Sequence, residues 1–144
     1  MIAVDTNVLV YAHRRDHELH QKAVTVLRDL AEAVEPWALP WPCIHEFIAV
    51  TTHARVFSPP STVDEALEQV AAWLASPSLV LLAERLNHWQ HLRGLLEAGD
   101  ARGGRVHDAR IVALCLAHGV TELWSADRDF GRFPQIRVRN PLVG

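Results

Sequence analysis

Short apolar segments alternate with longer amphipathic segments along the chain. Over the longer segments, apolar residues recur every three to four positions, which predicts helices at 6–13, 17–33, 42–53, 63–75, 85–98 and 107–119. The short segments between them predict strands at 2–4, 37–39, 78–82, 122–125 and 136–139. Strands that alternate with helices indicate a largely parallel central sheet with helices on both faces, a three-layer α/β/α sandwich.

Proline, glycine and hydroxyl residues mark several of the predicted helix ends. Pro42 suits the first turn of the third helix. Ser61 or Thr62 would cap the fourth helix in a capping-box-like arrangement. Gly119 suits the C-terminal end of the sixth helix. These residues agree with the boundaries that the apolar pattern predicts.

Length and composition indicate one folded domain, 1–144. Hydrophobic residues make up 49% of the 144 positions and charged residues 22%, values typical of a globular protein, and we find no repeat or linker. No apolar run approaches the roughly 20 residues that span a bilayer, and no secretory signal pattern is visible. We therefore expect a cytoplasmic protein without membrane contact, in which Cys43 and Cys115 are buried thiols.

Basic residues are unevenly distributed although the net charge is −3. Lys22 is the one lysine among 14 basic residues, and from Asp100 onward seven arginines face five acids. A metal ion that neutralised some of these acids would leave a locally basic surface suited to an anionic ligand. The alternative is an arginine-rich surface with no ligand.

Four acids fall where a parallel sheet would bring them together. Asp5 follows the first predicted strand and Asp127 follows the fourth, while Glu46 and Asp108 lie near the starts of helices. Ligands of open α/β sheets bind beyond the carboxyl ends of the strands, where the strand order reverses. We therefore expect these acids to converge at one edge of the sheet.

Each acid alone also has an ordinary structural explanation. Asp5 could cap a helix, Asp108 could complement a helix dipole, and Asp127 and Asp129 could be turn residues. Glu46 lies in the apolar stretch CIHEFIAV, which predicts a buried carboxylate in need of a partner. Several carboxylates in one place repel each other unless a cation is present, and oxygen ligands suit Mg²⁺ or Mn²⁺. Such a site indicates metal-dependent hydrolysis of a phosphodiester.

The order of these motifs resembles that of the PIN-domain ribonucleases. The motifs are D-T-N after the first strand, an isolated Glu46, H-D-A at 107–109 and S-A-D-R-D-F at 125–130. The segment SADRDFGRFPQIRVRNPL is similar to the C-terminal part of bacterial VapC toxins, and the resemblance spans the whole chain.

That resemblance implies a PIN-like fold, Mg²⁺- or Mn²⁺-dependent cleavage of RNA, and an acidic metal site. The implied metal-binding and catalytic residues are Asp5, Glu46, Asp108 and Asp127. Side chains that would steady them are Thr6, Asn7 and Ser125, with Asp129 as a fifth acid. The resemblance also implies a homodimer and inhibition by a VapB-type antitoxin, through which alone the chain would meet DNA.

Other segments leave alternatives open. Arg102 and Arg105, in a loop with three glycines, could contact RNA phosphates. The polar segment HRRDHELH (13–20) is either solvated surface or a contact for RNA or antitoxin, and Trp37 and Trp41 either line an antitoxin groove or belong to the core. Two other functions remain: a catalytically silent RNA- or protein-binding PIN module, and a phosphatase of haloacid-dehalogenase type. The phosphatase is disfavoured because position 7 is Asn and the one lysine lies in an early helix.

Overall fold

Five short parallel strands form the centre of the molecule, which we describe from a computed structural model over residues 1–143. The strands are β1 Ile2–Val4, β2 Trp37–Pro40, β3 Leu79–Leu82, β4 Glu122–Trp124 and β5 Arg137–Arg139. They pair in the order β3-β2-β1-β4-β5, and every pairing is parallel. The predicted parallel sheet is therefore confirmed, with all five strands close to their expected positions.

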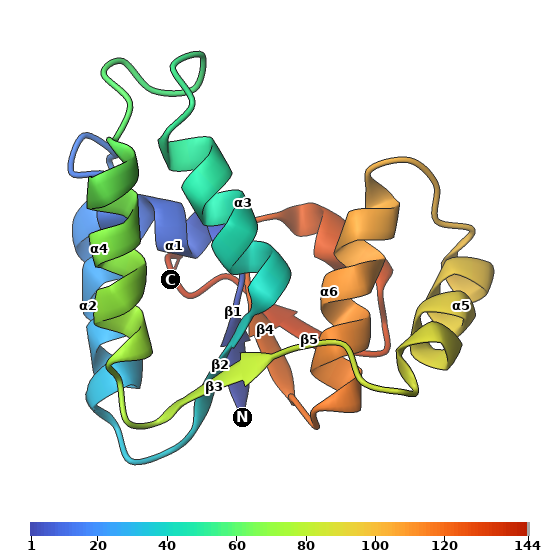
Figure 1. The fold of residues 1–144 in the computed structure, drawn as a ribbon. Helices are drawn as coiled ribbons and strands as arrows, with labels where there is room; N and C mark the ends of the chain where they lie inside the picture. The colour runs from blue at the N-terminus through green and yellow to red at the C-terminus, as the bar shows by residue number, and fades with distance from the viewer. Residues whose placement is uncertain (144) are drawn as a thin grey trace.

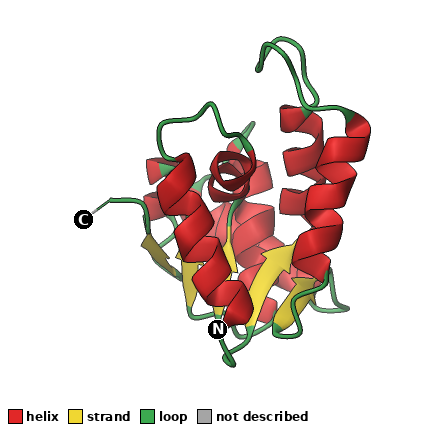
Figure 2. Cartoon of the chain, turned by 90° about the vertical axis from the view of Figure 1, so that its left-hand side faces the viewer, coloured by secondary structure: helices red, strands yellow, loops and turns green. Residues whose placement is uncertain are grey.

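Helices cover both faces of this sheet, as expected for a three-layer sandwich. They are α1 Thr6–His13, α2 His20–Glu32, α3 Trp41–Thr51, α4 Val63–Leu74, α5 His88–Gly99 and α6 Arg105–Ala117, with a short 3-10 helix η1 at Arg128–Arg132. Helices α2 and α4 lie on one side of the strands and α5 and α6 on the other (Figure 1). After a 90° turn the strands again lie between helices (Figure 2).

Strands β1 and β2 are apolar along their whole length because both of their faces are covered. Ala3, Val4 and all four residues of β2 are buried, and Trp37 has no exposed surface. The indole N–H of Trp37 donates to the Ser76 hydroxyl at 3.0 Å, so its one polar group is satisfied inside the core. Trp37 therefore belongs to the core and lines no groove, whereas Trp41 is half-buried. Truncation of Trp37 to alanine would cost about 3–5 kcal/mol.

Two helices begin later than the apolar pattern predicts, because side chains or backbone contacts hold the preceding turns. Helix α2 begins at His20 and not at position 17. The Nδ1 atom of His17 accepts a hydrogen bond from the backbone N–H of Leu19 at 3.0 Å, which fixes a turn before the helix. Helix α5 begins at His88, where the backbone N–H donates to the Arg85 carbonyl in another turn.

Helix ends and cysteines match the sequence predictions. Thr62 and Glu65 form a reciprocal capping box at the start of α4, and Gly119 follows α6 with a φ of 72°, the left-handed conformation that glycine accepts at least cost. Cys43 and Cys115 are buried free thiols. Within residues 1–143, no helix combines the length and apolar character needed to cross a membrane.

Candidate active site

The strand order reverses between β1 and β4, and the functional residues lie just beyond that point. The chain moves from β1 outward to β2 and β3, then returns past β1 to β4 and β5. The pairing of Val4 with Trp124 places the next residues, Asp5 and Ser125, side by side at the carboxyl ends of two neighbouring strands. This is the edge at which open α/β sheets bind ligands.

Asp5 occupies the N-cap position of α1, yet its side chain does not cap the helix. Its Oδ2 atom accepts hydrogen bonds from the Ser125 hydroxyl at 2.8 Å and from the Asn7 amide at 3.4 Å. Its Oδ1 atom faces the thiol of Cys43 on α3 at 3.6 Å. The capping explanation is therefore wrong: the carboxylate is only 5% exposed and points across the strand ends.

Asn7 and Ser125 tie the loop after β4 to the start of α1. The carbonyl Oδ1 of Asn7 accepts from the backbone N–H of Ala126 at 3.0 Å, and its amide donates to the Ser125 hydroxyl at 3.3 Å. The same hydroxyl accepts from the backbone N–H of Asp127 at 3.0 Å. These contacts position Asp5 and Asp127 relative to each other, although the two acids come from opposite ends of the chain.

The four acids of the sequence prediction line one cavity of about 270 Å³. They come from four separate elements: Asp5 follows β1, Glu46 lies on α3, Asp108 on α6, and Asp127 follows β4. Thr6 and Asn7 also line the cavity, and the remaining lining residues are apolar or aromatic. The structure thus brings together residues that span most of the chain.

Asp129 lies outside this group. Its side chain is exposed, and it is not among the residues that line the cavity. Its backbone N–H donates to the Oδ1 atom of Asp127 at 2.9 Å, so Asp127 caps η1 with one oxygen. The turn role considered for Asp127 is real and coexists with its place in the cavity.

Glu46 differs from the sequence expectation. Its residue surface is exposed, although it lines the cavity, and it therefore lies at the mouth and not in the interior. The buried residues of α3 are Cys43, Ile44, Phe47 and Thr51. Glu46 lies beside that buried stripe, so its apolar neighbours in the sequence do not surround it in space.

The acids raise one another's pKa values because no described cationic side chain lines the cavity. Burial raises the pKa of Asp5, with the charge of Glu46 adding to the effect. Partial burial at the mouth of the cavity and the charge of Asp108 raise the pKa of Glu46. Burial and the charge of Asp127 raise the pKa of Asp108 to about 6. The charge of His107 lowers the pKa values of Glu46 and Asp108 but does not cancel these effects, so the protein carries an electrostatic cost at this edge of the sheet.

The donor set matches a hard cation, but the described residues do not form a closed metal site. Among residues 1–143, no group of three or more His, Cys, Asp or Glu side chains is close enough to hold a metal ion together. Mg²⁺ commonly takes only one or two carboxylates and keeps several waters, which suits dispersed acids around a cavity. The buried hydroxyl of Thr6, which lines the cavity, has no hydrogen-bond partner among the described residues.

The two arginines predicted to contact RNA do not line the cavity. Arg102 is exposed and pairs with the carboxylate of Asp100 at 2.7 Å. Arg105 is the first residue of α6, one turn before Asp108, and is half-buried. Their contact with RNA remains a prediction.

Sequence reasoning missed three residues at or beside this cavity: Cys43, Tyr11 and Phe57. Cys43 contacts Asp5 and lies three positions before Glu46, and that helical spacing was the available signal for a shared face. Tyr11 and Phe57 line the cavity from α1 and from the loop after α3, and nothing in their local sequence links them to the acids.

Comparison with known proteins supports the resemblance. The PIN domain family matches residues 2–136. The VapC ribonuclease Mb2897 of Mycobacterium bovis is 42% identical over 144 residues, which cover 100% of this chain and 97% of that protein. The chain therefore belongs to the PIN-domain family and, within it, to the VapC ribonucleases.

Solved structures share the fold at low sequence identity. VapBC2 from Rickettsia felis, bound to a DNA fragment from its promoter, aligns with a TM-score of 0.69 at 19% identity, covering 97% of this chain and 98% of that one. VapC20 of Mycobacterium tuberculosis, a toxin that cleaves the sarcin–ricin loop, aligns with a TM-score of 0.68 at 18% identity, covering 95% and 99%.

Proposed function

We propose that this protein is the toxin of a type II toxin–antitoxin pair and hydrolyses RNA phosphodiester bonds at the acidic cavity. The observation that carries the proposal is the convergence of Asp5, Glu46, Asp108 and Asp127, from four elements, on one cavity at the reversal of strand order. Relationship to VapC ribonucleases over the full chain supports RNA as the substrate.

These acids would hold Mg²⁺ or Mn²⁺. When bound, the ion would supply positive charge to the attacking and leaving oxygens of an in-line displacement at phosphorus. Ser125 and Asn7 orient Asp5 by donating to Oδ2, which leaves Oδ1 on the side of Cys43. Asp127 is held by the contact between its own N–H and Ser125. Asp108, with a pKa of about 6, is mostly ionised only above that pH.

The test is cleavage of single-stranded RNA by the purified chain with Mg²⁺, with Mn²⁺ and with a chelator, followed by mapping of the new 5′ ends. We expect cleavage with either ion and none with the chelator. The matched control is Asp29→Asn, which changes an exposed acid outside the cavity. Equal cleavage in chelator would contradict the metal assignment. Binding of RNA without cleavage under every condition would instead support a catalytically silent PIN module.

An antitoxin partner forms part of the same proposal. Solved relatives include VapBC and FitAB, some of them bound to DNA. A second and larger concavity of about 1040 Å³ lies along α2, α4 and the end of α1, away from the four acids, and offers room for a partner segment. Light scattering of the chain alone and with its antitoxin would test the homodimer and the complex, and a promoter DNA fragment would bind only the complex.

A further inference from the structure

The acidic cavity is lined by apolar and aromatic side chains as well as by acids. Two of them are the half-buried rings of Tyr11 and Phe57, which together with Val56 we call the aromatic wall. Tyr11 lies near the end of α1, whereas Val56 and Phe57 belong to the loop between α3 and α4. The cavity therefore combines two unlike surfaces, one of carboxylates and one of rings.

Both rings are held from outside the cavity by the segment 14–19 between α1 and α2. The guanidinium carbon of Arg14 lies 4.3 Å from the centre of the Phe57 ring. The His17 ring stacks on Tyr11 with centroids 3.9 Å apart and planes 13° from parallel. Neither Arg14 nor His17 lines the acidic cavity, although each contacts a ring that does.

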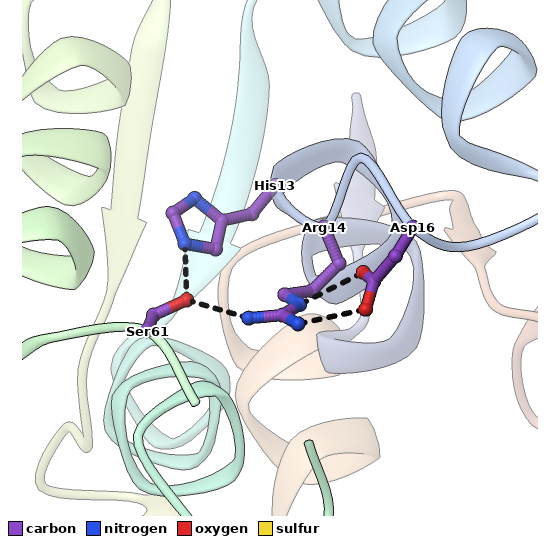
Figure 3. A network of polar contacts seen from close by, with 4 residues as sticks. All are labelled: His13, Arg14, Asp16 and Ser61. Carbon is purple, nitrogen blue, oxygen red and sulfur yellow. Dashed lines mark hydrogen bonds and ion pairs between the residues drawn. The ribbon is translucent and has the colours of Figure 1, made fainter. Parts of the chain in front are cut away.

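Arg14 is itself fixed by a network of polar contacts (Figure 3). Its guanidinium donates to both oxygens of Asp16, at 3.0 and 2.7 Å, and to the Ser61 hydroxyl at 3.3 Å. The Nε2 atom of His13 lies 2.9 Å from the same hydroxyl. The polar segment HRRDHELH therefore has a structural role, because it holds the aromatic wall in place.

The uncharged, largely aromatic side chains of the aromatic wall favour a planar, uncharged ligand group. No arginine, lysine or histidine among residues 1–143 lines the cavity, so no cationic side chain described there would bind a phosphate. Aromatic rings stack on nucleobases, and RNA exposes base faces where its nucleotides are unpaired. We propose that the aromatic wall binds the base of an unpaired nucleotide next to the scissile phosphate. This inference rests on the proposed function, because it takes the acids as the site of cleavage.

RNA is the occupant favoured by continuity with the acids. A nucleotide carries a base and a phosphate on one ribose, and this cavity presents a base-binding surface beside the carboxylates that would act on the phosphate. Substrate must enter the cavity of a ribonuclease, whereas the larger groove along α2 and α4 offers a separate place for a protein partner. An apolar side chain of the antitoxin is the competing occupant, and the experiment distinguishes it.

The experiment compares the wild-type protein with Phe57→Ala and Phe57→Tyr on short single-stranded RNAs of randomised sequence. We expect Phe57→Ala to lower kcat/KM about 10- to 100-fold on the preferred sequences, since one base loses its stacking partner. It should also flatten the nucleotide preference at one position beside the cut, while Phe57→Tyr keeps both. Trp89→Ala is the control, because it removes an exposed ring that lines neither cavity.

An abasic nucleotide at the affected position provides the decisive comparison. Wild-type protein should lose the same factor on the abasic RNA as it loses through Phe57→Ala, and the variant should lose nothing further. If Phe57→Ala destabilises the fold, Phe57→Leu keeps the bulk without the ring. Unchanged kcat/KM and unchanged preference in a folded variant would overturn the proposal. So would a loss confined to inhibition by the antitoxin.

A measurement of RNA binding tests the aromatic wall independently of RNA cleavage. Fluorescence anisotropy of the same RNAs with Asp5→Asn protein needs no cleavage. If wild-type protein cleaves no RNA, the proposed function fails, and anisotropy alone decides the role of the wall. Weaker binding after adding Phe57→Ala would support base binding, and equal binding would overturn it.

Discussion

Asp16 and Asp108 are the same residue type in opposite electrostatic settings. Asp16 receives two hydrogen bonds from the Arg14 guanidinium, which lower the pKa of its carboxyl. Asp108 is partly buried beside Asp127, and its pKa rises to about 6 although the charge of His107 opposes the shift. In the first cluster the protein supplies its own counter-charge. In the second the counter-charge must come from outside.

This difference distinguishes a structural cluster from a functional one. An acid that is paired within the fold needs no ligand, and its removal should affect stability alone. An acid left without a partner destabilises the protein until a cation or a proton arrives, which is the usual signature of a site. Substitutions in the two clusters should therefore have opposite consequences for stability and very different consequences for activity.

The largest effect is expected for Asp5→Asn. The substitution keeps the shape and the contacts with Ser125 and Asn7 but removes a buried charge that would hold the metal. We expect RNA cleavage to fall about 10²- to 10³-fold, because metal stabilisation of the displacement is worth several kcal/mol. The melting temperature without metal should rise. Undiminished cleavage by the folded variant would refute the assignment.

Ser125→Ala should have the next largest effect. The hydroxyl contacts Asp5, Asn7 and the backbone of Asp127, so its loss leaves buried polar groups unpaired. We expect cleavage to fall about 10- to 100-fold, as for other groups that orient metal ligands. Stability should fall by about 1–3 kcal/mol in denaturant unfolding. Ser125→Thr keeps a hydroxyl and is the matched control. Similar activity of both variants would show that the hydroxyl does not position Asp5.

The pH dependence of stability should follow the raised pKa of Asp108. The folded state binds a proton more tightly than an unfolded Asp with a pKa of 3.8, so protonation favours folding. The contribution is fully present below pH 3.8 and is lost as the pH rises through about 6. We expect the metal-free melting temperature to fall between about pH 4 and pH 6, less so in Asp108→Asn.

Metal should reverse that trend. Because a cation binds the ionised carboxylates, millimolar Mg²⁺ or Mn²⁺ should raise the melting temperature above about pH 6 and have little effect at about pH 5. A metal-induced shift of equal size at both pH values would show that these acids are not the ligands.

Asp16→Asn should have the smallest effect. The Asp16 carboxylate is more than half exposed, and the amide of the substituted side chain would still offer Arg14 an acceptor oxygen beside Ser61. We expect a slight loss of stability that disappears at high salt, with RNA cleavage close to that of the wild type. A large loss of cleavage without unfolding would mean that the Arg14 network acts on the cavity more strongly than its contacts suggest.

The sheet and its edge were predictable because local patterns determine them. A strand buried on both faces must be apolar throughout, as β1 and β2 are, and an acid that follows such a strand must lie at its carboxyl end. The helix starts were less predictable. The start of α2 depends on the turn that His17 makes with Leu19, a contact that no apolar period encodes.

Glu46 shows where the local pattern misleads. Its apolar neighbours predicted burial, yet the buried stripe of α3 runs through Cys43, Ile44, Phe47 and Thr51 and leaves position 46 beside it. The spacing of the apolar residues every three to four positions along α3 would have predicted that Glu46 is exposed. The partnership of Asp5 with Ser125 could not be read in this way, since 120 residues separate them and only the pairing of β1 with β4 brings them together.

That separation has a consequence for how the protein is made. During synthesis, Asp5 leaves the ribosome before Ser125, which follows 120 positions later. The strand that presents Ser125 pairs with β1 and β5, so the cavity is complete only when nearly the whole chain is available to fold. A nascent or prematurely terminated chain therefore lacks the assembled cavity. Activity at this cavity therefore arises only after synthesis has passed β5.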